Sequence, residues 1–93
     1  MRNYEAVFIF KPEDEQFKSG LESIRGEMKN AEAVISKEED MGVRELAYPI
    51  KKETRGHYFC FYAQIKPENI INIEKMAKLE KDVLKYLFVR KDD

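Results

Sequence analysis

The sequence predicts an α+β fold in which two helices cover one face of a four-stranded antiparallel sheet. Three observations support this prediction. Stretches of strand and helix character follow one another in the order β-α-β-β-α-β, one strand-like stretch contains a proline, and another alternates its aromatic residues onto one face. The chain has 93 residues, about the length of one domain, so we expect a single domain over residues 1–93.

The first strand is predicted at Met1–Phe10, and Pro12 ends it. Because both of its faces are apolar after Glu5, it is typical of a central strand. A helix is predicted at Glu13–Asn30, where apolar residues recur at i, i+4, i+7 and i+11. This stripe consists of Phe17, Leu21, Ile24 and Met28.

The second strand is predicted at a sheet edge. It rises through Glu32–Asp40, bends at Gly42 and continues over Val43–Ile50. Proline donates no hydrogen bond to a neighbouring strand, so Pro49 requires an edge position. A polar turn, Lys51–Gly56, then closes a hairpin.

The third strand is predicted at His57–Ile65, and strand alternation separates its two faces. On one face of the sheet we expect Phe8, Phe10, Phe59, Phe61 and Ile65 to be buried against Leu21, Ile24, Met28, Ile70 and Ile73. On the other, open face we expect Val7, Ile9, Tyr58, Cys60 and Tyr62.

The second helix is predicted at Pro67–Lys81, with Pro67 in its first turn, and the last strand at Val83–Arg90. The buried stripe of this helix is expected to contain Ile70, Ile73, Ala77 and Met76. The order of elements matches the split βαβ, or ferredoxin-like, motif. That topology places the second strand at an edge, as Pro49 independently requires.

Composition excludes several classes of protein. One cysteine, Cys60, forms no intrachain disulfide and no metal site alone. Without a signal-like segment or a long apolar run, the chain is expected to be cytoplasmic and to have no membrane contact. Net charge is −1, but basic residues outnumber acidic ones from Met41 onward, which weakly favours a polyanion contact there.

No catalytic motif is present in the sequence. The single histidine, His57, is expected to be a surface imidazole, and no nucleophile, base and orienting group can be assembled around it. No metal-ligand spacing or glycine-rich phosphate loop occurs either. We therefore expect no enzyme activity, no cofactor and no small-molecule substrate.

Three motifs carry a resemblance to a known family. They are Arg2-Asn3-Tyr4-Glu5 at the N-terminus, Gly42-Val43-Arg44 followed by Leu46-Ala47-Tyr48-Pro49-Ile50-Lys51, and Gly56-His57-Tyr58. Together they resemble the bacterial small-subunit ribosomal protein six family over nearly the whole chain. The resemblance implies a ferredoxin-like fold, binding to the central domain of 16S rRNA, and a heterodimer with small-subunit ribosomal protein eighteen. Two departures are a chain end at Asp93, without the long tail of many members, and a net charge less basic than RNA binding alone favours.

Candidate contact residues follow from charge and predicted position. For RNA they are Arg2, Tyr4, Lys51, Lys52, Arg55, Lys85 and Arg90, and for the protein partner Glu39, Arg44, Glu45, Tyr58 and Tyr62. Phosphate contacts favour the basic residues, and an edge strand with unpaired backbone groups favours the partner. Tyr4 and Tyr48 also have a packing interpretation, as sheet tyrosines with their hydroxyls at the rim.

Two other functions fit the same order of elements. Arg55–Tyr62 matches part of the signature of an independent RNA-recognition module, which would expose Phe8 and Phe59 on the open face to stack bases. The ribosomal interpretation buries both phenylalanines beneath the helices. The third alternative is an edge-strand adaptor that binds only protein.

Overall fold

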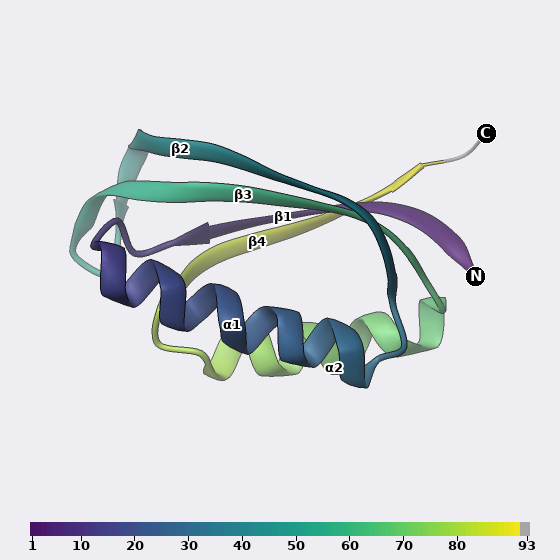
Figure 1. Ribbon diagram of the computed structural model, residues 1–93. Helices are drawn as coiled ribbons and strands as arrows, with labels where there is room; N and C mark the ends of the chain where they lie inside the picture. The colour runs from purple at the N-terminus through teal and green to yellow at the C-terminus, as the bar shows by residue number, and fades with distance from the viewer. Residues whose placement is uncertain (92–93) are drawn as a thin grey trace.

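The computed structural model of the protein is described for residues 1–91, and it has two layers (Figure 1). The elements are β1 (Arg2–Phe10), α1 (Asp14–Asn30), β2 (Val34–Ile50), β3 (Glu53–Ile65), α2 (Pro67–Leu79) and β4 (Val83–Lys91). The sheet order is β2-β3-β1-β4, with every neighbouring pair antiparallel and both helices on one face. This confirms the predicted ferredoxin-like α+β fold and the edge position of β2. The expectation about the chain end at Asp93 lies outside the described residues.

The core lies between the helices and the sheet. Phe8 and Phe61 are fully buried and meet edge to face, with ring centroids 5.8 Å apart, a favoured aromatic geometry. The other core members of the helix-covered face include Phe10, Phe59, Ile65, Leu21, Ile24, Met28 and Ile73. The predicted face assignment is therefore confirmed, and the RNA-recognition alternative is wrong, because Phe8 and Phe59 are not available to stack bases.

The second helix is shorter than predicted. It ends at Leu79 rather than at Lys81, since the backbone turns at Glu80 into the start of β4. Met76 is exposed, so its predicted place in the buried stripe is wrong. Ile73 and Ala77 alone form the fully buried part of that stripe, and Ile70 packs against it half-buried.

The hairpin is also tighter than predicted. β2 is one strand from Val34 to Ile50, with a bulge between Asp40 and Gly42, where Gly42 has a φ of 81°. This confirms the predicted bend, which a glycine accommodates without steric cost. The turn comprises only Lys51 and Lys52, and the remainder of the predicted turn belongs to β3.

Residues Leu46–Pro49 leave the regular pairing and form what we call the β2 arch. Glu45 pairs with Arg55 and Ile50 pairs with Glu53, so the arch stands opposite a single residue, Thr54. The extra length lets this end of β2 fold over the open face of the sheet. Pro49, which has no N–H to donate, sits where no regular pairing is required.

The arch packs over Gly56 of β3. A methyl group added at Gly56 would overlap the Cγ2 atom of Ile9 and approach the Leu46 Cδ2 atom to 3.3 Å. Gly56 thus leaves room for the side chains of Ile9, Leu46 and Leu84, which all approach this position. This is why Ile9 is only 9% exposed although no helix covers it, which corrects its predicted place on the open surface.

The two ends of the molecule differ in which segments they bring together. The N-terminus and the end of β4 lie at one end, and the β2–β3 turn lies at the other, near the end of α2 (Figure 1). Within residues 1–91, no helix is long and apolar enough to cross a membrane.

Candidate nucleic-acid and partner surfaces

The basic residues predicted to contact RNA fall into two groups at opposite ends of the sheet. Arg2 pairs with Ile65 at the end near the N-terminus, where Arg90 pairs with Tyr4. The remaining candidates are Lys51, Lys52, Arg55 and Lys85, which lie toward the hairpin end. Eight residue steps along β1 separate the two ends by about 26 Å, so the structure does not form one continuous basic patch.

At the hairpin end, two lysines occupy a strained backbone conformation. Lys51 has a φ of 50° and Lys52 a φ of 67°, a region that costs non-glycine residues roughly 1–2 kcal/mol each. Two-residue hairpin turns of this hand usually contain Asn and Gly. The Lys51 ammonium donates a hydrogen bond of 2.9 Å to the Val83 carbonyl oxygen, which ties the turn to β4.

Lys85 lies on the open face and reaches the β2 arch. Its ammonium donates a hydrogen bond of 3.1 Å to the Tyr48 hydroxyl and lies 5.6 Å from the Tyr48 ring centroid. Tyr48 is 55% exposed, so its packing interpretation is wrong: the ring stands on the surface beside a cation.

Tyr4 and Arg55 occupy less favourable positions for an RNA contact than predicted. Tyr4 is buried and packs edge-on against Phe88, with ring centroids 6.5 Å apart. This confirms its packing interpretation, and the buried ring offers little surface to RNA. Arg55 is exposed opposite Glu45 in the pairing of β2 with β3, and a carboxylate facing a guanidinium reduces the attraction for phosphate.

The predicted partner residues are held on the open face by contacts between β2 and β3. The Arg44 guanidinium lies 5.7 Å from the Tyr58 ring centroid, and the Tyr62 hydroxyl donates a hydrogen bond of 2.9 Å to the Glu39 carboxylate. That bond raises the pKa of Tyr62 to about 12. Glu45, by strand alternation, points to the opposite face from Arg44, so the structure does not bring it together with the others.

An apolar hollow of about 210 Å³ lies at the centre of the open face. It is lined by Val7, Ile9, Tyr58, Lys85, Tyr86 and Leu87. Cys60 lies next to Val7 in the β1–β3 pairing and is 3% exposed, so its predicted exposure is wrong, and burial raises the pKa of its thiol. Leu87 is a strongly exposed member of this face that sequence reasoning missed, although its alternation with Tyr86 and Phe88 places it there.

His57 is not the surface imidazole that was predicted. Its ring stacks on Phe17, with centroids 3.5 Å apart, and its Nε2 atom lies 2.6 Å from the Asp40 Oδ1 atom. The hydrogen bond with His57 lowers the pKa of Asp40. The Asp40 carboxylate also accepts a hydrogen bond from the Gly42 backbone N–H, so this contact braces the bulge of β2.

Nothing in the described part of the chain resembles a metal centre. No group of three or more His, Cys, Asp or Glu side chains within residues 1–91 is arranged to hold a metal ion.

A small ferredoxin-like protein with basic groups at both ends and an apolar hollow on an uncovered sheet face has the surfaces of a component of a larger assembly. A family model described as "Ribosomal protein S6" matches residues 3–90. The chain therefore belongs to the ribosomal protein S6 family of the small ribosomal subunit, as its motifs predicted.

Its relatives match nearly the whole of this chain, but not all of them have its length. Small ribosomal subunit protein bS6 of Treponema denticola is 39% identical over 93 residues and is matched over its whole length. The bS6 protein of Helicobacter pylori (strain P12) is 38% identical over 92 residues, which cover 97% of this chain and 65% of that protein.

Two solved structures share the fold of this chain. The crystal structure of 30S ribosomal protein S6 from Thermotoga maritima superposes with a TM-score of 0.87 at 27% identity, over 97% of this chain and 87% of that one. The C-terminal domain of the MgtC protein from Mycobacterium tuberculosis shares the fold alone, with a TM-score of 0.64 at 7% identity over 98% of this chain and 88% of that one.

Proposed function

We propose that this protein is a structural, non-enzymatic component of the small ribosomal subunit. In this role it binds the central domain of 16S rRNA together with small-subunit ribosomal protein eighteen. The observation that carries the RNA part of the proposal is the pair of lysines at left-handed positions of the hairpin turn.

Strain at these two positions points to a function for the side chains. An Asn-Gly turn would close the same hairpin without the steric cost of a lysine at positive φ. Strained backbone conformations cluster at functional sites, where the surrounding structure holds them in place. Two ammonium groups at the tip of a hairpin suit the phosphates of an RNA backbone, which are recognised mainly by charge and shape.

The open face and the edge of β2 provide the surface for the protein partner. β2 carries four acidic and two basic residues, so its charge favours a basic partner. The apolar hollow between Val7 and Leu87 supplies area to bury at the centre, while Glu39 and Arg44 orient the partner at the rim. The helical face remains in solvent.

The RNA contacts are tested by neutralising basic residues at each end of the sheet in turn. We expect the neutral pair Lys52→Gln and Lys85→Gln to weaken binding of the partner-bound protein to a central-domain rRNA fragment. The slope of log affinity against log salt should fall by about 0.7–0.9 per lost phosphate contact. Arg2→Gln tests the other end in the same way. An unchanged slope in the triple variant would place the phosphate contacts elsewhere and favour an adaptor that binds only protein.

The partner surface is tested with Arg44→Glu. Titration calorimetry with small-subunit ribosomal protein eighteen should show weaker binding, while thermal unfolding of the isolated protein changes little, because an exposed charge contributes little to stability. Lys18→Glu on the exposed side of α1 is the matched control and should bind as the wild type does. Wild-type affinity in the Arg44→Glu protein would remove this strand from the interface.

A further inference from the structure

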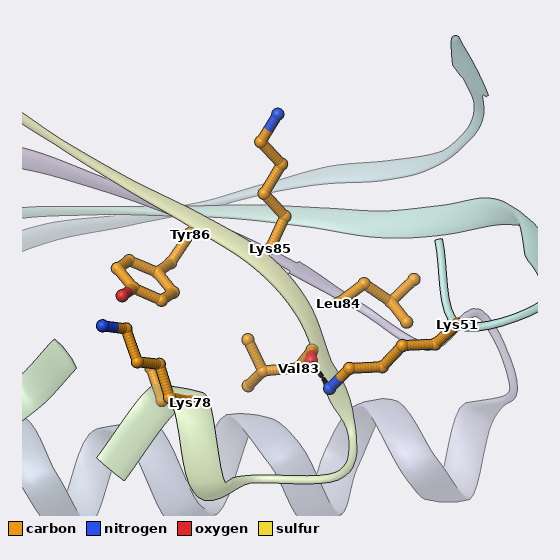
Figure 2. A pocket seen from close by; sticks show the side chains of 7 residues that line it. Lys51, Lys78, Val83, Leu84, Lys85 and Tyr86 are labelled. Atoms are coloured by element: carbon orange, nitrogen blue, oxygen red, sulfur yellow. Dashed lines mark hydrogen bonds between the residues drawn. The ribbon is translucent and has the colours of Figure 1, made fainter. Parts of the chain in front are cut away.

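A second hollow, of about 280 Å³, lies at the hairpin end between the last turn of α2, the start of β4 and the β2–β3 turn (Figure 2). It is lined by Lys51, Ala77, Lys78, Val83, Leu84, Lys85 and Tyr86. None of the functions assigned above uses Lys78, whereas Tyr86 also lines the apolar hollow of the open face. The volume of the hollow at the hairpin end is just below the usual range for small-molecule sites, which limits an occupant to about one nucleotide.

Two ammonium groups flank this hollow. Lys51 reaches it from the turn and Lys78 from α2, whereas the Lys85 side chain points away, to the open face (Figure 2). Lys51 donates one hydrogen bond to Val83, and an ammonium has three donors, so it retains capacity for an anion. Lys78 is exposed and extends toward the Tyr86 hydroxyl.

Acidic groups do not oppose these cations at the lining. Of the residues that form this hollow, none carries a carboxylate. Glu80, in the adjoining turn, accepts a hydrogen bond from the Asp82 backbone N–H at 3.3 Å. The C-terminal end of α2 contributes partial negative charge, which Lys78 in its last turn offsets.

The floor of the hollow is apolar and aromatic. Val83 and Ala77 are almost fully buried, and the Tyr86 ring is half-buried against Phe8, with centroids 6.4 Å apart. An aromatic ring that is held by the core and lines a hollow is a rigid surface on which an unpaired base stacks at low entropic cost.

We propose that this hollow binds one unpaired nucleotide of RNA, with its base on Tyr86 and its phosphate between Lys51 and Lys78. The proposal rests on the RNA binding proposed above and names what this end of the protein recognises. A phosphate in a duplex would satisfy the lysines but would leave the aromatic floor without a partner. The occupant is therefore a nucleotide extruded from a helix or belonging to a single-stranded segment.

The isolated protein tests the site directly. Backbone amide signals are followed by NMR during titration with adenosine 5′-monophosphate, adenosine or inorganic phosphate, up to ~10 mM, about tenfold above a millimolar Kd. We expect adenosine 5′-monophosphate to shift the signals of Lys78 and Val83–Tyr86 further than either fragment. Equal shifts with inorganic phosphate would overturn the base contact, and no localised shift would overturn the site.

Variants then test the site in the partner-bound protein with a central-domain rRNA fragment. Tyr86→Leu keeps the apolar packing and should weaken binding about 5- to 150-fold, whereas Tyr86→Phe keeps the ring and should bind normally. Lys78→Gln should lower the salt slope by about 0.7. Lys29→Gln, an exposed lysine at the far end of α1, is the matched control and should change the slope less.

The outcomes separate this inference from the proposed function. If the wild-type pair binds the fragment but the Tyr86→Leu and Lys78→Gln proteins bind equally well, the nucleotide site is overturned and the ribosomal role stands. If the wild-type pair does not bind the fragment, the proposed function fails, while the nucleotide titration still decides the site. Should Tyr86→Leu unfold, Lys78→Gln and the titration remain decisive.

Discussion

The two faces of the sheet are stabilised in different ways. The helix-covered face packs phenylalanines of β1 and β3 against two helices, and Phe8, Phe10 and Phe61 are fully buried. The open face buries only a few side chains, and it does so by local means: the β2 arch covers Ile9, and cross-strand contacts with β2 anchor the rings of Tyr58 and Tyr62.

This difference separates stability from function within one sheet. Apolar burial on the helix-covered face supplies most of the folding free energy. The open face retains an apolar hollow and the exposed side chains of Leu87 and Val89, which a partner can cover. The hairpin end retains strained lysines. Substitutions on the two faces should therefore affect different measurements.

The largest expected effect comes from the helix-covered face. Phe61→Ala removes a fully buried ring that contacts Phe8 and Phe59, and we expect it to lower the free energy of unfolding by roughly 3–5 kcal/mol. Leu87→Ala on the open face, where the side chain is exposed, should change it by about 0.5 kcal/mol or less. Urea unfolding of both proteins measures the contrast. Similar losses of unfolding free energy in the two variants would contradict the different contributions of the two faces to stability.

A smaller loss of stability is expected from an added methyl group at Gly56, beneath the β2 arch. Gly56→Ala places a methyl group against Ile9, and such overpacking costs roughly 1–3 kcal/mol. Gly26→Ala is the control, because an added methyl group there meets nothing within 4 Å, and it should stabilise the helix by about 1 kcal/mol.

Combining Gly56→Ala with Ile9→Ala tests the cause. The double variant should lose less stability than the sum of the single changes, since the overlapping methyl group is gone. Strict additivity would show that a methyl group at Gly56 does not meet Ile9 as described.

The helix-covered face could be predicted from the sequence because its packing follows strand and helix periods. Phe59 and Phe61 alternate along β3, and Leu21 and Met28 recur along α1, so each period alone indicates the buried side. The burial of Ile9 could not be predicted in this way. It depends on residues Leu46–Pro49 leaving their pairing and folding over the sheet, and no periodicity encodes that path.

The candidate sites were predicted in part. The charge of the side chains identified the basic residues but does not show that they lie in two places. The predicted antiparallel topology does, because it places Arg2 and Lys52 at opposite ends of the sheet. The conformation of the turn lysines depends on a two-residue turn that the composition of Lys51–Gly56 does not define. His57 shares the face of Phe59 by alternation, which is the signal that would have indicated its stacking on Phe17.

The stability contributed by the contact between Asp40 of β2 and His57 of β3 should depend on pH. The hydrogen bond with His57 lowers the pKa of Asp40 below its ordinary 3.8. A carboxyl group with a lowered pKa in the folded state contributes stability above its unfolded pKa and loses it as the pH falls through the folded pKa. The stability difference between the wild type and His57→Gln should therefore shrink below about pH 4.

NMR titration of the Asp40 carboxyl carbon checks this directly. In His57→Gln its pKa should move up toward the ordinary value, although the hydrogen bond from the Gly42 N–H remains. A small stability difference should persist in acid, because stacking on Phe17 is also lost. An unchanged Asp40 titration would show that the hydrogen bond does not set this pKa.

The most direct test concerns the strained lysines at the hairpin end. Lys52→Gly relieves a positive φ and should make the protein roughly 0.5–1 kcal/mol more stable, while it removes one cation. We measure urea unfolding of the isolated protein and, across a salt series, the affinity of the partner-bound protein for a central-domain rRNA fragment. We expect higher stability together with weaker RNA binding and a salt slope lowered by about 0.7–0.9. A protein that is more stable and binds RNA with unchanged affinity and slope would contradict a role for this lysine in phosphate recognition.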